Sequence, residues 1–418
     1  MAAAEVMQPS TRSLWNFRLG VVCFAALAVS FPVAWVSLSK LLLFLSGVGY
    51  IITGWVLGRA RQSWKDLRSV KVILLIVFSF SASLLWTPVD LDFAQMALVK
   101  HAKLLTVILL IVLIQSSAEA RVAMTVFALG QLSLLVFTLL LAWGAQLPWE
   151  SKFRGDNVVF SSYLDQSTML ASSAAIFWYL RHRIALPAWV GAAIASTLLA
   201  TALFLLEGRT AYIIAIVSFS LALMWKLPKH LRLMAIIVVP LVVSLGLYVL
   251  APPVKERVDH IVSGTQAYVN PNPAYTSEGW RLNAWHRSLQ AIADSPVVGH
   301  GVGSWALSVR PHEGDSYAKR FGKGNSSNPH QELLLWGVEL GLWGIALFVA
   351  LFVALALDAK RFSDTQSRIA LSMIAALAIA CMFNSMLYDA LIGDYFCVAL
   401  GLCMALGLQE LGQPKASR

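Results

Sequence analysis

Basic side chains at the ends of apolar segments are the residues whose type and spacing could do chemistry in this sequence. Arg209 stands in the short connection 207–210 between two strongly apolar runs, and Lys100 and Lys103 are three residues apart, so they share one face of a helix. A charge near a membrane costs free energy unless it reaches water or a partner. Since the arginine guanidinium is a planar fork that matches phosphate oxygens, this pattern predicts an outer-face site for a phosphate-bearing, lipid-like headgroup.

Six basic residues share this location at the outer ends of apolar runs or in short outer connections: Lys40, Lys100, Lys103, Lys152, Arg154 and Arg209. Simpler interpretations stay open for two of them. Lys40 can extend its amine to water along its own aliphatic stem, and Arg209 can form an ion pair with Glu207. Lys100, Lys103 and Arg154 are candidates for further contacts with a phosphate group.

A histidine stands where a turn gives way to an apolar run. Asn328-Pro329 is a turn signal, and the run starts directly after His330, so this imidazole is expected at the outer end of a membrane helix. Imidazole can take up a proton near neutral pH, which makes His330 a candidate general base. The alternative is a plain hydrogen-bonding role. Glu339 lies about 2.5 helical turns further along, deeper in the same helix, and is a candidate substrate contact.

Acidic residues on the outer side are too scattered to predict a metal site. We find no HExxH or CxxC pattern; Asp389 and Asp394 lie together in the last outer turn, and Asp90 and Asp92 lie in an earlier one. Two such acids could bind a divalent cation only weakly or could form a solvated turn. We therefore expect basic residues rather than a metal to neutralise phosphate, and no cofactor, with Asp389 as a further candidate substrate contact. The cysteines lie in apolar stretches and are interpreted as core residues: Cys23, Cys381, Cys397 and Cys403.

The composition identifies the elements that must position these residues. Of 418 residues, 58% are hydrophobic and 13% are charged, and the formal net charge is +10; soluble proteins carry about 25% charged residues. This excludes a soluble enzyme, a disordered chain, a disulfide-stapled domain and a nucleic-acid-binding module. Because backbone polar groups have no water partner in lipid, the apolar runs must be helices. The prediction is an all-α polytopic membrane protein with about 12 transmembrane helices, surrounded by membrane lipids.

The predicted spans are twelve apolar runs: 17–36, 39–57, 72–86, 98–115, 122–144, 166–181, 186–206, 211–226, 233–251, 331–356, 368–387 and 391–409. Basic residues gather in alternate connections, such as 59–71, 226–232 and 360–368, so the positive-inside rule places those connections and both termini in the cytoplasm.

One outer connection is far longer than a link between packed helices. We expect three regions: spans one to nine over 1–251, an outer loop domain over 252–329, and spans ten to twelve over 330–418. Within the loop, "WRLNAWHRSLQAIAD" (280–294) has helical spacing and should stop at Ser295-Pro296. "GHGVG" (299–303) is a glycine-rich turn, which is more typical of a plain loop than of a phosphate site.

Three motifs in order resemble those of the O-antigen ligase and polymerase superfamily. "HQELLLWGVELG" (330–341) resembles its H-N-x-x-L-x-x-x-x-E-x-G signature, and "GWRLNAWHRSLQAIADSPVVGHGVGSW" (279–305) resembles its R-x-x-x-W followed by P-x-x-G-x-G. "EGRTAYIIAI" (207–216) resembles its S-R-x-x-x stretch. With the span pattern, the resemblance covers nearly the whole chain. Gln331 and Gly208 depart from the usual Asn and Ser, and neither departure removes a charged group.

The resemblance implies a GT-C-like glycosyltransferase of the bacterial inner membrane, with its active site on the periplasmic face. Such an enzyme moves a glycan from undecaprenyl diphosphate to lipid A–core when it is a ligase, or to another lipid-linked repeat when it is a polymerase. Carried over by position, Arg209 and Arg281 would bind the diphosphate and His330 would activate the acceptor hydroxyl. Arg287 is a further candidate for the site. Direct transfer without a metal would invert the anomeric centre.

The single large outer loop favours a ligase over a polymerase, which often has two. A protein-directed oligosaccharyltransferase of the same superfamily stays open, because the sequence does not show the acceptor. Non-enzymatic alternatives are a secondary transporter or a flippase for the lipid-linked glycan. Those would place ionisable groups near the middle of the membrane, whereas here they gather at its outer boundary.

Overall fold

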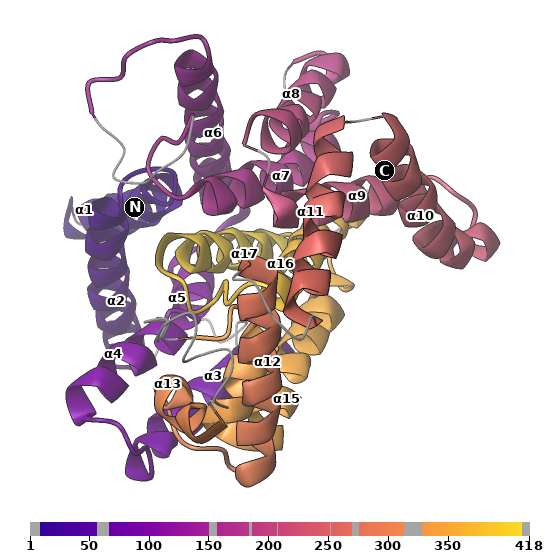
Figure 1. Ribbon diagram of the computed structural model, residues 1–418. Coiled ribbons are helices and arrows are strands. Elements are labelled where there is room, and N and C mark those ends of the chain that lie inside the picture. The colour runs from indigo at the N-terminus through magenta and orange to yellow at the C-terminus, as the bar shows by residue number, and fades with distance from the viewer. Residues whose placement is uncertain are drawn as a thin grey trace, which may run out of the picture.

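The computed structural model describes residues 9–56, 67–149, 157–183, 186–206, 208–250, 252–269, 276–312 and 328–411. Regular structure in these ranges is entirely helical (Figure 1). The long helices are α1 (Pro9–Ala28), α2 (Val33–Val56), α3 (Arg68–Ala82), α4 (Leu91–Ala102), α5 (Leu105–Leu113), α6 (Ser117–Ala142), α7 (Tyr163–Leu180), α8 (Ala188–Ala200), α9 (Arg209–Met224), α10 (Arg232–Leu250), α11 (Pro252–Val269), α12 (Ser277–Asp294), α15 (Glu332–Ala359), α16 (Asp364–Phe383) and α17 (Ala390–Leu411). Short elements are η2 (Ser83–Leu85), η3 (Thr201–Leu205), η4 (Lys229–Leu231), α13 (Trp305–Ser308) and η5 (Arg310–His312).

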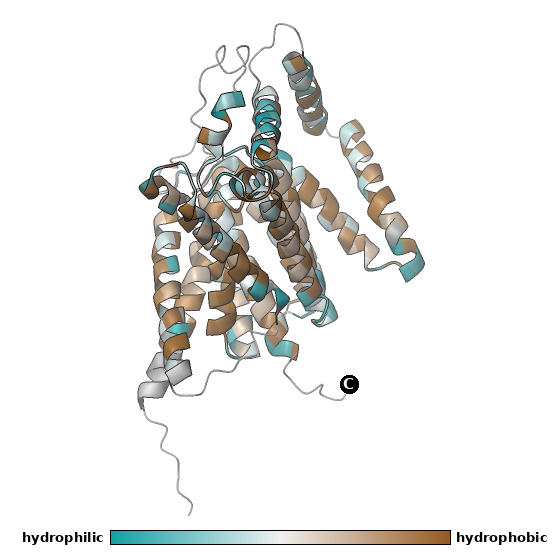
Figure 2. Ribbon diagram, turned by 90° about the horizontal axis from the view of Figure 1, so that it is seen from below, coloured by the Kyte–Doolittle hydropathy of each residue, from teal (hydrophilic) through white to brown (hydrophobic). Residues whose placement is uncertain are grey.

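Several of these helices are long and apolar enough to cross a membrane. Over the described residues there are seven, or up to nine if each of two bent helix pairs counts as one span. Figure 2 shows apolar residues along the shafts of the helices and hydrophilic residues gathered at many of their ends. All twelve predicted runs fall on helices, but the total of twelve spans is not confirmed. The chain is a multi-pass helical membrane protein; the side that each connection faces stays a prediction.

Two predicted spans are wrong in detail. The run 17–36 is divided, because α1 ends at Ala28 and α2 begins at Val33, one residue after Pro32. Proline has no N–H to continue a helix, which explains the division. The run 98–115 is bent by 46° between α4 and α5. The bend places Lys103 at the junction rather than on a continuous helix face.

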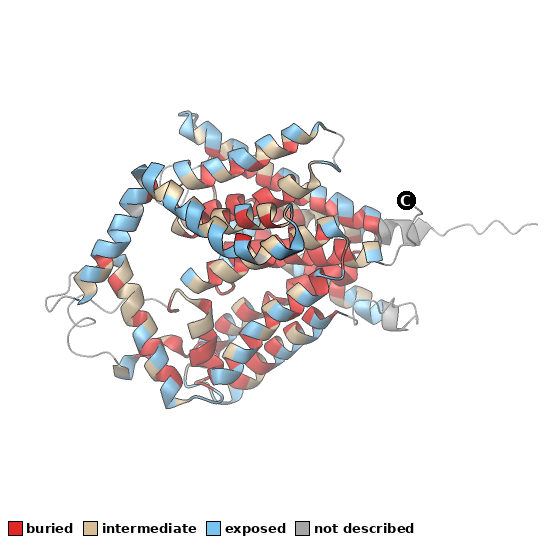
Figure 3. Ribbon diagram, turned by 90° about the vertical axis from the view of Figure 1, so that its right-hand side faces the viewer, coloured by how far each residue is buried: buried red, intermediate tan, exposed pale blue. Residues whose placement is uncertain are grey.

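The centre of the bundle is α17, which packs against α5, α6 and α16 (Figure 1). Figure 3 shows how buried residues concentrate on the inner faces of the packed helices. The Tyr395 hydroxyl lies within 2.8 and 2.7 Å of the Ser172 and Ser173 hydroxyls of α7 and donates to the Met169 carbonyl at 3.1 Å. These contacts give the buried hydroxyl groups partners that lipid could not provide, so they tie α7 to the core.

The predicted helix 280–294 is confirmed as α12, which ends at Asp294 as expected. The glycine-rich turn that follows packs against a break in α15, where Gly341 has φ 65° and ψ −153°. At this break the N–H groups of His300 and Gly301 donate to the carbonyl oxygens of Val338 and Glu339 at 2.9 and 2.8 Å. The turn therefore acts as a structural lock on α15 and supports the plain-loop interpretation.

Adding a side chain to this turn should destabilise the fold. Gly299 has φ 66°, and a Cβ atom there would lie 2.5 Å from backbone atoms of Leu340 and Gly341. Gly299→Ala should therefore lower the free energy of unfolding by about 2 kcal/mol or more, measured by thermal unfolding of the detergent-solubilised protein. Gly246→Ala on α10 is the matched control, because no atom lies within 4 Å of its Cβ position. Equal melting temperatures for the two variants would contradict the lock.

Candidate functional site

His330 occupies a strained turn that two tryptophans of α12 support. Its φ of 51° lies in the left-handed region, which costs a non-glycine residue free energy unless neighbours hold it. Its N–H donates to Asn328 Oδ1 at 2.9 Å, and Trp285 Nε1 donates to the Pro329 carbonyl at 3.1 Å. The Trp280 ring lies edge-on, with ring centroids 5.4 Å apart. The motif tryptophan and histidine thus meet in space as parts of one turn.

Asn384 fixes the orientation of the His330 ring. Its side-chain Oδ1 lies 2.9 Å from His330 Nδ1, and because a carbonyl oxygen only accepts, Nδ1 carries the hydrogen. That tautomer leaves the lone pair on Nε2. Asn384 is buried and is the first residue after α16. It was not among the predicted site residues, since a lone asparagine at the end of an apolar run carries no distinctive sequence pattern.

The surroundings of His330 favour its neutral form. Burial and the positive charge of Arg281 lower the pKa of His330, while the Asn384 hydrogen bond and Asp389 act in the opposite direction. Burial raises the pKa of Asp389, whereas the charges of His330, Lys103 and Lys100 lower it. At neutral pH the imidazole is therefore able to accept a proton.

Arg209 and Arg281 line the same largely apolar groove. Arg209 is the first residue of α9, and Arg281 lies on α12; both line a cavity of about 440 Å³ together with Glu278. Burial and the neighbouring Arg209 lower the pKa of Arg281, while Glu278 acts against this. The cavity wall is mostly apolar: Tyr212, Ile216, Leu247, Val258, Leu282 and Phe383. Two guanidinium groups and a mostly apolar wall suit a molecule with an anionic head and a hydrocarbon tail.

Arg209 forms an ion pair with Glu278 of α12. The alternative partner considered from the sequence, Glu207, lies outside the described residues. The departure at Gly208 also has a structural counterpart. A Cβ atom at position 208 would collide with the Ser167 hydroxyl of α7. A serine hydroxyl from a neighbouring helix therefore occupies the space beside Gly208.

The predicted lysines lie beside the loop that joins α16 to α17. Lys103 Nζ donates to the Asp389 carbonyl, and Lys100 Nζ lies 4.0 Å from the Tyr388 ring centroid. Lys40 pairs with Asp394 at 2.8 Å, so its amine has a protein partner rather than only water. Asp389 and both lysines influence one another electrostatically, and through Asp389 they adjoin His330.

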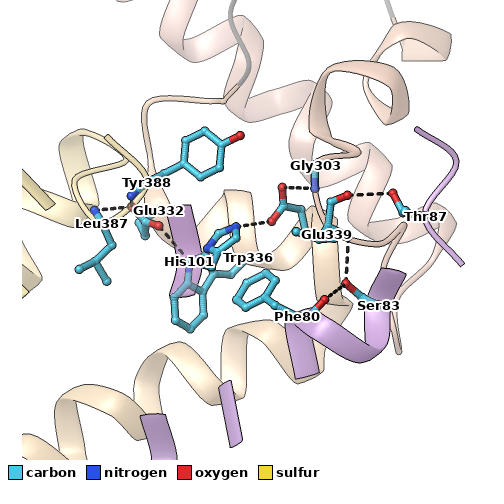
Figure 4. A network of polar contacts seen from close by, with 11 residues as sticks. Phe80, Ser83, Thr87, His101, Gly303, Glu332, Trp336, Glu339, Leu387 and Tyr388 are labelled. Carbon is cyan, nitrogen blue, oxygen red and sulfur yellow. Dashed lines mark hydrogen bonds and ion pairs between the residues drawn. The ribbon is translucent and has the colours of Figure 1, made fainter. Parts of the chain in front are cut away.

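Glu339, a candidate substrate contact, has protein partners for its carboxylate. Its side chain is 1% exposed, and its carboxylate lies 2.8 Å from His101 Nε2 and accepts the Gly303 N–H at 2.9 Å (Figure 4). Because both oxygens are occupied inside the protein, Glu339 joins α4, α15 and the glycine-rich turn. Sequence spacing placed it correctly below His330 but could not show these partners.

A second buried acid, Glu332, supports the loop that carries Asp389. Its carboxylate accepts from Trp336 Nε1 and from the backbone N–H groups of Leu387 and Tyr388 at 2.9, 2.9 and 3.3 Å (Figure 4). Gln331, which departs from the family asparagine, caps the same helix by accepting the Leu334 N–H. The first turn of α15 is therefore capped by Gln331, and through Glu332 it holds the loop that carries Asp389.

The remaining predicted residues lie apart from the groove or outside the description. Arg287 is on α12 but is only 7% exposed and is not among the residues that line the cavity. Arg154 falls outside the described residues. Over the ranges that the structure describes, no group of three or more histidine, cysteine, aspartate or glutamate side chains could hold a metal ion.

One known protein family matches part of this chain. The family model described as O-antigen ligase matches residues 194–349, which run from α8 through the groove arginines and His330 into α15. The search of curated proteins gives no match. The matched segment contains all three motifs on which the resemblance was based. Over this segment, which is less than half of the chain, the protein is similar to the O-antigen ligase family.

Proposed function

We propose that this protein is an O-antigen ligase, which transfers a glycan from undecaprenyl diphosphate to lipid A–core at the periplasmic face of the bacterial inner membrane. The observation that carries the proposal is that two arginines line one apolar groove and that one of them, Arg281, acts electrostatically on His330, whose ring is oriented by Asn384. The groove suits the polyprenyl chain, and the guanidinium groups suit the diphosphate.

The proposed reaction needs only groups already in place. The acceptor hydroxyl attacks the anomeric carbon while its proton moves to His330 Nε2. The bond from that carbon to the phosphate oxygen breaks, and the oxygen leaves with the bonding electrons, so the anomeric configuration inverts. Arg209 and Arg281 stabilise the charge that grows on the leaving diphosphate. Asn384 keeps the proton on Nδ1, so that Nε2 faces the reaction as the acceptor.

Reconstitution of the purified protein tests this function. It is incubated with undecaprenyl-diphosphate glycan and lipid A–core in the presence of a chelator. Glycan on the core sugar supports the ligase and metal-independent transfer. Longer lipid-linked chains would instead identify a polymerase, and glycan on an added protein acceptor would identify an oligosaccharyltransferase. Movement of the lipid-linked glycan across liposomes with no transfer would contradict an enzyme altogether.

Replacing the residue that orients His330 should shift the pH dependence. Asn384→Asp places a carboxylate beside Nδ1–H, which stabilises the imidazolium and raises the pKa of His330. Because the general base works in its neutral form, the acidic limb of the pH–rate profile should move to higher pH. Asn384→Leu, which cannot accept the hydrogen bond, should lower transfer roughly tenfold. An unchanged profile in a folded Asn384→Asp variant would show that Asn384 has a packing role only.

A further inference from the structure

The Arg209 guanidinium, which the proposed function assigns to the donor diphosphate, already has an anionic partner. Glu278 reaches it from the first turn of α12, and both side chains line the same groove. The Arg209 side chain is 31% exposed and the Glu278 side chain 13%, so the pair lies at the surface of the cavity rather than deep in packing. A diphosphate that enters the groove therefore meets an Arg209 guanidinium that is already paired with the Glu278 carboxylate.

Local contacts allow this carboxylate to change partners. Besides Arg209, Glu278 accepts a hydrogen bond from the neighbouring Ser277 hydroxyl at 2.9 Å. On its other side the carboxylate lies against Gly264 of α11, where a Cβ atom would come within 2.8 Å of Oε2. Thr276 also caps this helix, by accepting the Gly279 N–H at 3.0 Å. The carboxylate can leave Arg209 without undoing the helix end.

Charge balance gives a reason for Glu278 to leave Arg209 when a diphosphate binds. The groove is lined by the guanidinium groups of Arg209 and Arg281 and by the carboxylate of Glu278. A diphosphate that joins a lipid to a sugar carries one negative charge on each phosphorus, which matches the two arginines. With both phosphates bound, the carboxylate would be an unmatched like charge beside them, which is unfavourable in a desolvated site.

We propose that Glu278 is the exchangeable counter-ion of Arg209 and a specificity-determining residue of the donor site. It stands in for phosphate when the groove is empty, gives way to the donor diphosphate, and returns to Arg209 when the lipid diphosphate product leaves. Occupants with a single weak negative charge fail to displace it. This inference rests on the proposed function, because it assumes that a diphosphate binds at these arginines.

Binding of farnesyl diphosphate to the purified full-length protein tests the exchange, by calorimetric titration at fixed ionic strength. Glu278→Gln keeps the size and polarity of the side chain but removes the competing charge, so it should bind farnesyl diphosphate about fivefold more tightly than the wild type. In the transfer assay, farnesyl diphosphate should inhibit Glu278→Gln at correspondingly lower concentrations. Glu256→Gln, an exposed acid on α11, is the matched control and should bind like the wild type.

The outcomes separate this inference from the proposed function. Wild-type binding that Arg209→Gln abolishes supports the diphosphate site itself. If Glu278→Gln then binds with equal or weaker affinity, the exchange is overturned while the diphosphate site stands. If the wild type does not bind farnesyl diphosphate at all, the proposed donor site is overturned, and the exchange with it. Glu278→Ala, which also lacks the charge, provides the same comparison should Glu278→Gln fail to fold.

Discussion

Arg281→Gln should reduce glycan transfer by at least about a hundredfold while leaving the protein folded. Arg281 lines the groove together with Arg209 and acts electrostatically on His330, so in the proposed reaction it would lie near the charge that grows on the leaving diphosphate. Glutamine keeps a polar side chain but is shorter and provides neither the charge nor the fork that binds phosphate oxygens. The measurement is the initial rate of transfer from undecaprenyl-diphosphate glycan to lipid A–core.

The stability of the same variant makes the test specific. Burial and the Arg209 charge lower the pKa of Arg281, which means that its charged form is disfavoured in the folded protein. Removing that charge should therefore leave the melting temperature unchanged or raise it. Arg310→Gln, an exposed residue of η5, is the control and should retain both transfer and stability. Full transfer by folded Arg281→Gln would remove Arg281 from the mechanism.

Helix positions were predictable because lipid leaves the backbone no alternative to a helix. Each apolar run lies on a helix, but the ends and breaks of the helices depend on single residues, which a hydropathy average over many residues does not show. Pro32 divides one run, and Gly341 breaks α15 where the glycine-rich turn docks. A window of apolar residues contains no information on such docking, since the partner lies far away in the chain.

Arg209 was predicted as a site residue because a charge in a short connection between apolar runs has little reason to be present except function. Arg281 and His330 were predicted from the family resemblance. Arg209 and Arg281 line one groove, and Arg281 acts electrostatically on His330. Glu339 satisfied the same reasoning, but its partners are His101 and a backbone N–H, so its charge has a structural reason. An acid in a membrane protein can serve packing as well as chemistry, and only its partners distinguish the two.

Residues that act through others escaped the sequence analysis. Asn384 touches only the Nδ1 side of His330, and Glu278 was one of several acids in a long polar segment. Neither carries a motif of its own, since the role of each depends on a contact across 54 or 69 positions of the chain. Their proposed roles follow only from their contacts with His330 and Arg209 in the folded chain.

His330→Gln should abolish most transfer, by roughly a hundredfold or more, while farnesyl diphosphate still binds. Glutamine can donate a hydrogen bond to Asn384 but cannot accept the hydroxyl proton, so only the proton transfer is lost. The wild-type pH–rate profile provides a second test of the same base. Because burial and Arg281 lower the pKa of His330, its neutral form persists below the ordinary histidine value of about 6.5, and the acidic limb should lie below that pH. Transfer at the wild-type rate by His330→Gln, or an acidic limb above that value, would show that another group is the base.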